Sequence, residues 1–251
     1  MSSEAPAGPL REPRRRSGGS RALVFLLLSL SLLAACAGPG AGAREALRRG
    51  DTALSLDDPE EALRAYREVL AADPRNPGAL LGLARAYVAT GDAEAALEIF
   101  AGLELAAPEV FGAGRDAYQQ ALDAAASSRA ERGDAAGGLR FLRRLAELDP
   151  ARAGLAERLR IAIVAEGERL LLEGRPSAAE GLFQEVLRAA PGQIEATLGL
   201  ARSLLERGSV DEAIRVLSDA SVRHPGDDRI EALMDRAIEI RYPSSPAKLS
   251  L

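Results

Sequence analysis

Few residues of this 251-residue chain could do chemistry. It contains one histidine, His224, and one cysteine, Cys36. A protein zinc site takes several His, Cys or carboxylate ligands, and here the Asp and Glu residues fall at helical spacing on polar faces instead of converging. His224 precedes Pro225 where Asp73 and Asp149 stand in other proline-terminated segments, which indicates a polar turn residue. We therefore predict that the protein is not an enzyme and holds neither metal nor cofactor.

Cys36 stands at the end of a segment typical of export. Five arginines between positions 11 and 21 precede the apolar run 22–35, whose last residues are Leu33-Ala34-Ala35. A secretory signal peptide has this order of basic residues, then apolar residues, then small residues. The run has 14 residues, whereas a membrane-spanning helix needs roughly 20. Cleavage is therefore favoured, with a non-lipidated signal and an uncleaved anchor as the alternatives.

The four residues from Leu33 to Cys36 resemble the lipobox of bacterial lipoproteins. This resemblance implies that residues 1–35 are removed as a lipoprotein signal peptide and that the Cys36 thiol receives diacylglycerol. Two or more acyl chains anchor a protein stably in a membrane. Because the arginine-rich flank stays cytoplasmic, the mature chain is expected on the periplasmic side of a bacterial cell envelope. Ala37 after the cysteine favours the outer membrane, and residues 36–42 are predicted to form a flexible tether.

Composition predicts an all-α protein that does not bind nucleic acid. Ala, Leu, Glu and Arg dominate, and these are strong helix formers. The net charge is -5, and the chain without residues 1–35 has 27 basic against 35 acidic residues. Because no basic block occurs after residue 21, neither nucleic-acid binding nor charge-driven adhesion to anionic lipid is expected. We also expect no small-molecule substrate.

The chain repeats itself every 34 residues. Residues 77–110 show the pattern most fully, with two apolar stripes at helical spacing separated by Thr90-Gly91-Asp92, where the glycine ends one helix and the aspartate caps the next. Small, large and proline positions recur together: Ala62, Tyr66 and Pro74 as Ala96, Phe100 and Pro108, and Ala179, Phe183 and Pro191 as Ala213, Leu217 and Pro225.

This pattern resembles that of the tetratricopeptide repeat (TPR) family. The matching residues are Leu80, Leu83, Ala84, Tyr87, Ala96, Phe100, Leu103 and Pro108. The resemblance implies a right-handed α-α superhelix, a TPR solenoid of five helix pairs. The expected units are 43–76, 77–110, 119–152, 160–193 and 194–227. A capping helix is expected over 228–241 and a disordered tail over 242–251.

The third unit departs from the others. It carries Gly138 where the other units have alanine, and Arg129 at the tyrosine position of the family. Glycine inside a helix costs about 0.5–1 kcal/mol relative to alanine, so Gly137-Gly138 predicts the softest unit.

Two insertions flank this unit. The prolines Pro108, Pro150 and Pro191 are 42 and 41 residues apart instead of 34. We expect the first insertion to be partly loop, because it contains Gly112 and Gly114. The second is expected to extend one long helix over 151–173.

In the TPR family the first helices of the units line a concave wall that binds a segment of another protein. Carried over to this chain, the resemblance implies the following wall residues: Arg44, Leu47, Arg48, Asp51, Leu54, Leu81, Arg85, Val88, Gln120, Asp123, Ser127, Ile161, Val164, Glu168, Leu171, Glu195, Leu198, Arg202 and Leu205. These residues alternate basic, apolar and acidic, which favours a mixed amphipathic partner. Leu47 and Asp51 stand where chaperone-binding members need carboxylate-binding groups, so that activity is not implied.

Together these patterns predict a lipid-anchored, non-catalytic TPR scaffold that mediates protein-protein interactions in the bacterial envelope. Two alternatives stay open at this point. The chain could be a regulatory accessory subunit of an envelope hydrolase or synthase, or an assembly factor for pili or outer-membrane proteins.

Overall fold

The computed structural model describes residues 39–243, and this part of the chain contains helices and no strands. The helices are α2 (Pro39–Ser55), α3 (Pro59–Ala72), α4 (Pro77–Thr90), α5 (Ala93–Ala106), α6 (Pro108–Ala113), α7 (Arg115–Glu131), α8 (Ala135–Leu148), α9 (Leu155–Leu172), α10 (Pro176–Ala189), α11 (Ile194–Glu206), α12 (Val210–Arg223) and α13 (Asp228–Arg241). None of these helices is long and apolar enough to cross a lipid bilayer.

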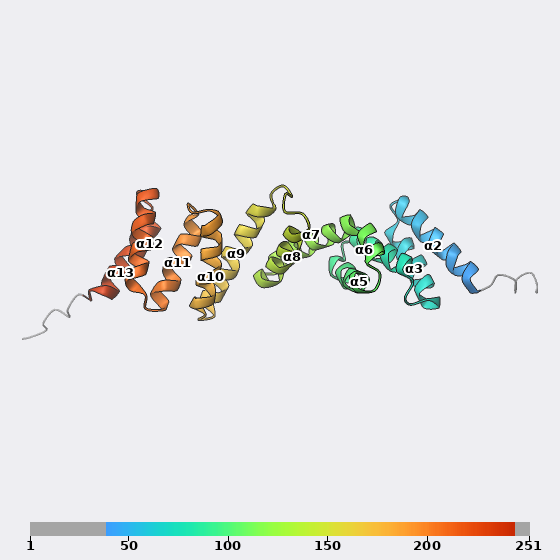
Figure 1. Ribbon diagram of the computed structural model, residues 1–251, viewed down its shortest axis with the longest axis horizontal. Coiled ribbons are helices and arrows are strands. Elements are labelled where there is room, and N and C mark those ends of the chain that lie inside the picture. The colour runs from blue at the N-terminus through green and yellow to red at the C-terminus, as the bar shows by residue number, and fades with distance from the viewer. Residues whose placement is uncertain (1–38, 244–251) are drawn as a thin grey trace, which may run out of the picture.

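The helices form one elongated stack of helix pairs. Figure 1 shows α2 at one end and α13 at the other, with each pair lying beside the next. Helices that follow one another in sequence pack together, as do α2 with α4, α4 with α7, α9 with α11 and α11 with α13. Every unit therefore buries its apolar stripes on its neighbours, which confirms the predicted solenoid of helix pairs.

The turns inside the five pairs fall at the same place in each predicted unit. The fifteenth residue of each predicted unit has a positive φ, which reverses the chain between the two helices. Four of these residues are glycines and the first is an aspartate: Asp57 (φ 58°), Gly91 (83°), Gly133 (76°), Gly174 (69°) and Gly208 (79°). In the first three units an aspartate then caps the second helix, as Asp92 does by accepting a hydrogen bond from the backbone N–H of Ala95 (3.2 Å).

Two aromatic rings hold the stack together near its ends. The Tyr66 ring is fully buried between Gly50 and Gly82, and the Phe183 ring lies in the same way between two glycines. A Cβ atom added at Gly82 would lie 2.3 Å from the Tyr66 ring. Glycine on the first helices thus lets each ring enter between successive pairs.

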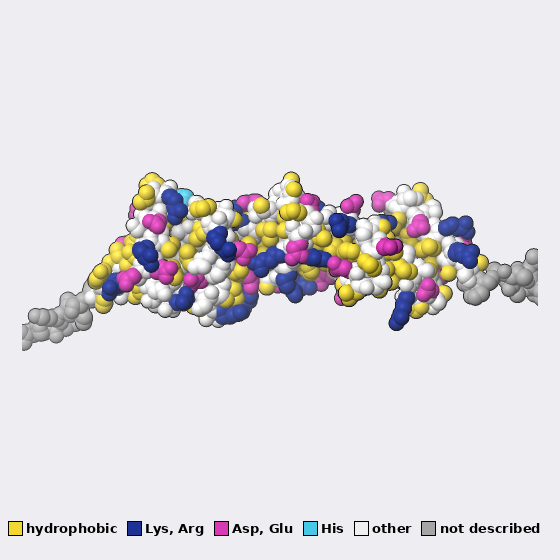
Figure 2. Space-filling model, in the orientation of Figure 1, with side chains coloured by type: hydrophobic (Ala, Val, Ile, Leu, Met, Phe, Trp, Pro, Cys, Tyr) yellow, Lys and Arg dark blue, Asp and Glu magenta, His cyan; other side chains and the backbone are white. Residues whose placement is uncertain are grey.

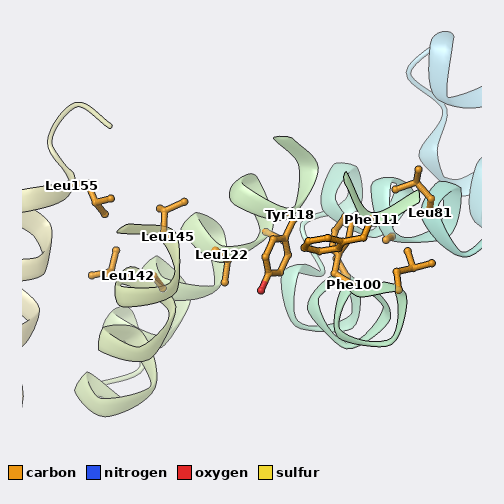
Figure 3. Close-up of a cluster of buried hydrophobic side chains, with 13 residues drawn as sticks. Leu81, Phe100, Phe111, Tyr118, Leu122, Leu142, Leu145 and Leu155 are labelled. Carbon is orange, nitrogen blue, oxygen red and sulfur yellow. The ribbon is translucent and has the colours of Figure 1, made fainter. Parts of the chain in front are cut away.

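The first insertion is helical, so the prediction that part of it is loop is wrong. Residues Pro108–Ala113 form α6, and the chain breaks only at Gly114 before α7 begins at Arg115, four residues earlier than expected. Phe111 of α6 packs against Phe100 and Tyr118, with ring centroids 6.3 and 5.1 Å apart (Figure 3). The insertion therefore adds a third ring to the core, and this contact keeps α6 helical.

The second insertion is only partly helical. The helix α9 begins at Leu155 and not at residue 151, because Gly154 has a φ of 75° that no right-handed helix accepts. Residues 149–154 form turns instead. Leu155 is buried beside Leu142 and Leu145 (Figure 3), so the start of α9 is fixed by packing.

The two ends of the described chain can be compared with the predicted tether and the predicted capping helix. The tether expected at 36–42 is wrong in its last four residues, because α2 begins at Pro39. The helix α13 covers Asp228–Arg241 as expected and buries Ile230 and Ala237 on the last pair. The predicted signal peptide, Cys36 and residues 244–251 lie outside the described residues.

Candidate protein-binding surface

A row of four connected hollows runs along the first helices from α4 to α13. The first, the α4/α7 hollow, has a volume of about 350 Å³, and the second, the arginine hollow around Asp123, Arg152 and Arg158, has about 320 Å³. The third, the α7/α9 groove, has about 670 Å³, and the fourth, the α9/α13 hollow, has about 600 Å³. Neighbouring hollows share lining residues. Gln120 belongs to the first two, Ser127 and Arg158 to the second and third, and Glu168 to the last two. The row is therefore continuous along the stack.

Most of the predicted wall residues of units two to five line this row. They are Arg85, Val88, Gln120, Asp123, Ser127, Ile161, Val164, Glu168, Glu195, Leu198 and Arg202. Each first helix presents these side chains because its opposite stripe is buried on the second helices. The row thus brings together side chains from α4, α7, α9 and α11.

Other predicted wall residues lie elsewhere. Leu81 and Leu171 pack in the core and line none of the four hollows. Leu205 is half-buried and also packs in the core. The family pattern assigned these three leucines to the wall by register, whereas the structure turns them toward the neighbouring pair.

The first unit contributes no residue to the row. Arg48 lines a separate hollow between α2 and α3, and the carboxylate of Asp51 accepts a hydrogen bond from the Tyr66 hydroxyl (2.7 Å). Arg44, Leu47 and Leu54 line none of these hollows. The row therefore starts at the second unit.

The charged wall residues are held by partners within the protein. Arg85 donates to the backbone carbonyl of Ala113 (2.7 Å), Glu168 pairs with Arg202, and Glu195 lies 3.8 Å from Arg229. These contacts link successive units, so the pattern of charge along the row is fixed before a partner arrives.

In the arginine hollow two arginines share one carboxylate. The carboxylate of Asp123 accepts a hydrogen bond from Arg152 (2.9 Å) and another from Arg158, which also donates to the Ser127 hydroxyl (3.1 Å). Burial opposes ionisation of Asp123, but the two arginines outweigh it and hold the pKa of this carboxyl below its ordinary value. Asp123 is thus ionised at neutral pH between two guanidinium groups.

The α7/α9 groove is mostly apolar. Alanines, glycines and leucines of α7, α8 and α9 line it, and Ile161 and Leu172 stand at its rim with 55% and 90% of their surface exposed. Figure 2 shows basic side chains gathered across the middle of the visible face, over α8 and α9. Arg152, Arg158 and the groove were not predicted from the sequence, although the position of the second insertion could have indicated them.

The structure also places the residues considered for chemistry. His224 ends α12, and its Nε2 lies 3.1 Å from the backbone carbonyl of Gly192 at the turn after α10. Within residues 39–243 no group of three or more His, Cys, Asp and Glu side chains could hold a metal ion.

The chain is similar to several known proteins. The sequence is 33% identical over 172 residues to the cellulose synthase 2 operon protein C of Komagataeibacter xylinus; the match covers 64% of this chain and 12% of that relative. The chain therefore spans only about an eighth of the relative's length. Among solved structures, a thermophilic TPR protein of Thermus thermophilus is 24% identical, with 78% and 98% of the two chains covered and a TM-score of 0.34. A TPR repeats protein of Bacteroides fragilis is 12% identical, with 79% and 98% covered and a TM-score of 0.46.

The profile of the tetratricopeptide repeat matches residues 53–124 and 170–237. The two segments together make up more than half of the chain, and the unmatched stretch between them contains most of the divergent third unit. The chain belongs to the tetratricopeptide repeat family.

Proposed function

We propose that this protein is a lipid-anchored scaffold of the bacterial cell envelope that binds segments of partner proteins along its first helices. The observation that carries the proposal is the continuous row of hollows over units two to five. Its lining alternates apolar and charged side chains, which suits an amphipathic segment of a partner. TPR proteins in general act as non-catalytic scaffolds, and this site has the surface that such a role needs.

The anchor rests on the sequence around Cys36. In the proposal, lipid on Cys36 holds the protein on the periplasmic side of a membrane, and Ala37 favours the outer membrane. Because α2 begins at Pro39, three residues after the cysteine, the first unit would stand close to the bilayer. The row of hollows starts in the second unit and would therefore face the periplasm.

The anchor is tested with the Cys36→Ser variant expressed in a Gram-negative host. The wild-type protein is expected in the membrane fraction, with an acylated N-terminal peptide in mass spectra. The variant is expected in the soluble periplasmic fraction or as an unprocessed precursor. An N-terminal peptide without lipid on wild-type Cys36 would refute the anchor.

The binding surface is tested by photo-crosslinking in cells. A photoreactive phenylalanine analogue at Gln120 or Val164 lies in the row of hollows. The matched control is Ala101, which is exposed on α5 and lines none of them. The two wall positions are expected to capture the same envelope proteins and the control none of these. Equal capture at all three positions, or no capture from the wall, would contradict the proposal.

A second candidate is favoured by the relative from Komagataeibacter xylinus, whose name places it in a cellulose synthase operon. In this version the scaffold is an accessory subunit of an envelope polysaccharide synthase. Purified protein should then bind such a synthase and change its turnover, and the Val164 crosslink should capture a synthase subunit. Unchanged turnover at saturating scaffold would exclude this role and leave the general scaffold function intact.

A further inference from the structure

The junction between the third and fourth units differs from the other junctions of the stack. The first helices of adjacent units pack closely at every other junction, whereas the backbones of α7 and α9 lie apart and the two helices meet through side chains such as Arg158 on Asp123. The second insertion separates them, because the turns at 149–154 and the first turns of α9 lie between the units. The α7/α9 groove is the space left by this separation.

This space corresponds to the position of a buried ring in neighbouring units. Tyr66, Phe100 and Phe183 occupy the twenty-fourth position of units one, two and four, and Leu142 occupies it in unit three. Tyr66 and Phe183 fill the gap between glycines of two first helices. In unit three the corresponding residues are Ala126 and Ala165, and both line the open groove together with Leu142. The groove is therefore an inter-unit socket that its own second helix does not fill.

The charges beside this socket are unequal. Arg152 and Arg158 share the single carboxylate of Asp123, and Arg158 lines both the arginine hollow and the groove. The other charges at the groove are balanced, since Arg169 and Arg175 pair with Glu166 and Glu173, and Glu168 pairs with Arg202. One guanidinium at the mouth of the socket thus has no carboxylate of its own. An anionic group is the complement of this arrangement.

The charge of the surrounding segment points the same way. Residues 115–175 contain eleven arginines and ten acidic residues, whereas the sequence on either side of this segment is acidic. A segment with negative charge would be repelled by both ends of the stack and not by its middle. This difference favours binding at the groove over binding elsewhere along the row.

From these observations we propose that the α7/α9 groove binds an acidic amphipathic helix of a partner protein. A bulky apolar side chain of the helix enters the socket between Ala126 and Ala165, and a neighbouring Asp or Glu pairs with Arg152 and Arg158. This inference rests on the proposed function and adds the chemistry of the partner and the place where it binds.

The test uses a synthetic helical peptide of about four turns, with leucines and one central tryptophan on one face and glutamates beside them. The protein contains no tryptophan, so the peptide emission reports its own burial. We expect a blue shift when the peptide binds the full chain. A second peptide with lysine in place of glutamate is expected to bind at least about tenfold more weakly.

Two variants locate the site. Ala165→Phe places a ring in the socket and is expected to weaken binding of the glutamate peptide about tenfold. Ala101→Phe, on α5 and outside the hollows, should leave binding unchanged. Arg152→Gln leaves Arg158 and Asp123 as a balanced pair and should weaken binding and lower its dependence on salt. Arg143→Gln is its control, because Arg143 pairs with Glu185 away from the row.

The inference is overturned if the glutamate peptide does not bind, if both peptides bind equally, or if Ala165→Phe binds as the wild type does. The crosslinking at Gln120 and Val164 stands apart from these results. Capture of envelope proteins there, together with failure of the peptide test, would retain the scaffold function and reject the acidic helix at this groove. Failure of the crosslinking itself would reject the scaffold function.

Discussion

At the level of single residues, aromatic rings of the second helices require glycine at certain positions of the first helices. Glycine inside a helix is unfavourable, yet Gly50, Gly82, Gly167 and Gly199 all lie on first helices. Each has an aromatic ring where a Cβ atom would stand, at 2.7, 2.3, 2.6 and 2.4 Å respectively. The loss of helix propensity is offset by the burial of Tyr66 and Phe183 between adjacent units.

A pair of glycine variants separates these two effects. In Gly199→Ala the new methyl group overlaps the buried Phe183 ring, and we expect the free energy of unfolding to fall by about 1–3 kcal/mol. Gly181→Ala is the control, because Gly181 lies inside α10 with nothing within 4 Å of an added Cβ. It should raise stability by about 0.5–1 kcal/mol. Urea unfolding of both variants measures the difference, and equal shifts would show that the ring does not constrain position 199.

Tyr66 should make the protein sensitive to alkali. Burial, together with the hydrogen bond to Asp51, raises the pKa of the Tyr66 hydroxyl well above its ordinary value. A tyrosine in the unfolded chain ionises near pH 10. Above this pH the unfolded state is stabilised by ionisation, whereas the folded state keeps Tyr66 protonated and is not. The contribution of Tyr66 is therefore complete below about pH 10 and is lost as the pH rises further.

Tyr66→Phe tests this effect, because phenylalanine is the natural residue at this position in units two and four. At pH 8 the variant should be less stable by at most about 1 kcal/mol, the usual contribution of one hydrogen bond. Between about pH 10 and 11 the wild type should lose stability relative to the variant. Thermal unfolding of the wild type and the variant at pH 8 and at about pH 10.5 measures this change. A stability difference between the two proteins that is the same at both pH values would contradict the raised pKa of Tyr66.

At the level of helices and units, the regular part of the fold could be predicted and the insertions could not. Gly91 and Gly208 mark turns by their chemistry, so the 34-residue register follows from the sequence. The helix α6 depends on Phe111 contacting Phe100 and Tyr118, a tertiary contact that no local pattern contains. The binding row divides in the same way: Val164 and Glu168 follow from register, whereas Arg152 reaches Asp123 only because the insertion folds back.

The third unit shows a local compensation for its unusual residues. Arg129, at the tyrosine position of the family, pairs with Glu94 of the preceding unit and with Asp134 (each 2.8 Å). Gly138 lies so close to α7 that a Cβ atom would stand 3.2 Å from the Ala126 carbonyl oxygen. The glycine therefore permits close packing of α7 on α8. Its helix-weakening effect remains, and the backbone of α7 also lies apart from that of α9.

We expect α7 and α8 to open first in hydrogen exchange. Their amides should exchange faster than those of α4 with α5 or α10 with α11, because one face of α7 borders the groove instead of a neighbouring helix. Mass spectrometry of peptic fragments after exchange measures this order. Uniform protection across the five units would contradict it.

At the scale of the whole molecule, the charge pairs along the row make the stack a surface with a set pattern. Arg85, Glu168 and Glu195 bind partners in the protein itself, so most of the wall presents little uncompensated charge. Ion pairs exposed in this way contribute little to stability, at most about 1 kcal/mol each. Their main effect is to fix where a partner can pair, and in the arginine hollow two arginines share one carboxylate.

The junction at the groove should also divide the unfolding of the molecule. Stability in repeat proteins is close to a sum of units and of the interfaces between neighbours, so a weak interface uncouples the two sides. Here residues 39–148 and 155–243 meet mainly through α8 on α9, with the Arg143–Glu185 pair and the arginines at Asp123 in addition. We expect two unfolding transitions in urea. In each, the free energy of unfolding should depend less steeply on urea concentration than it would if the whole chain unfolded in one step. Fluorescent labels placed in α4 and in α11 should report different midpoints, whereas coincident midpoints would show that contact through α8 and α9 alone couples the whole stack.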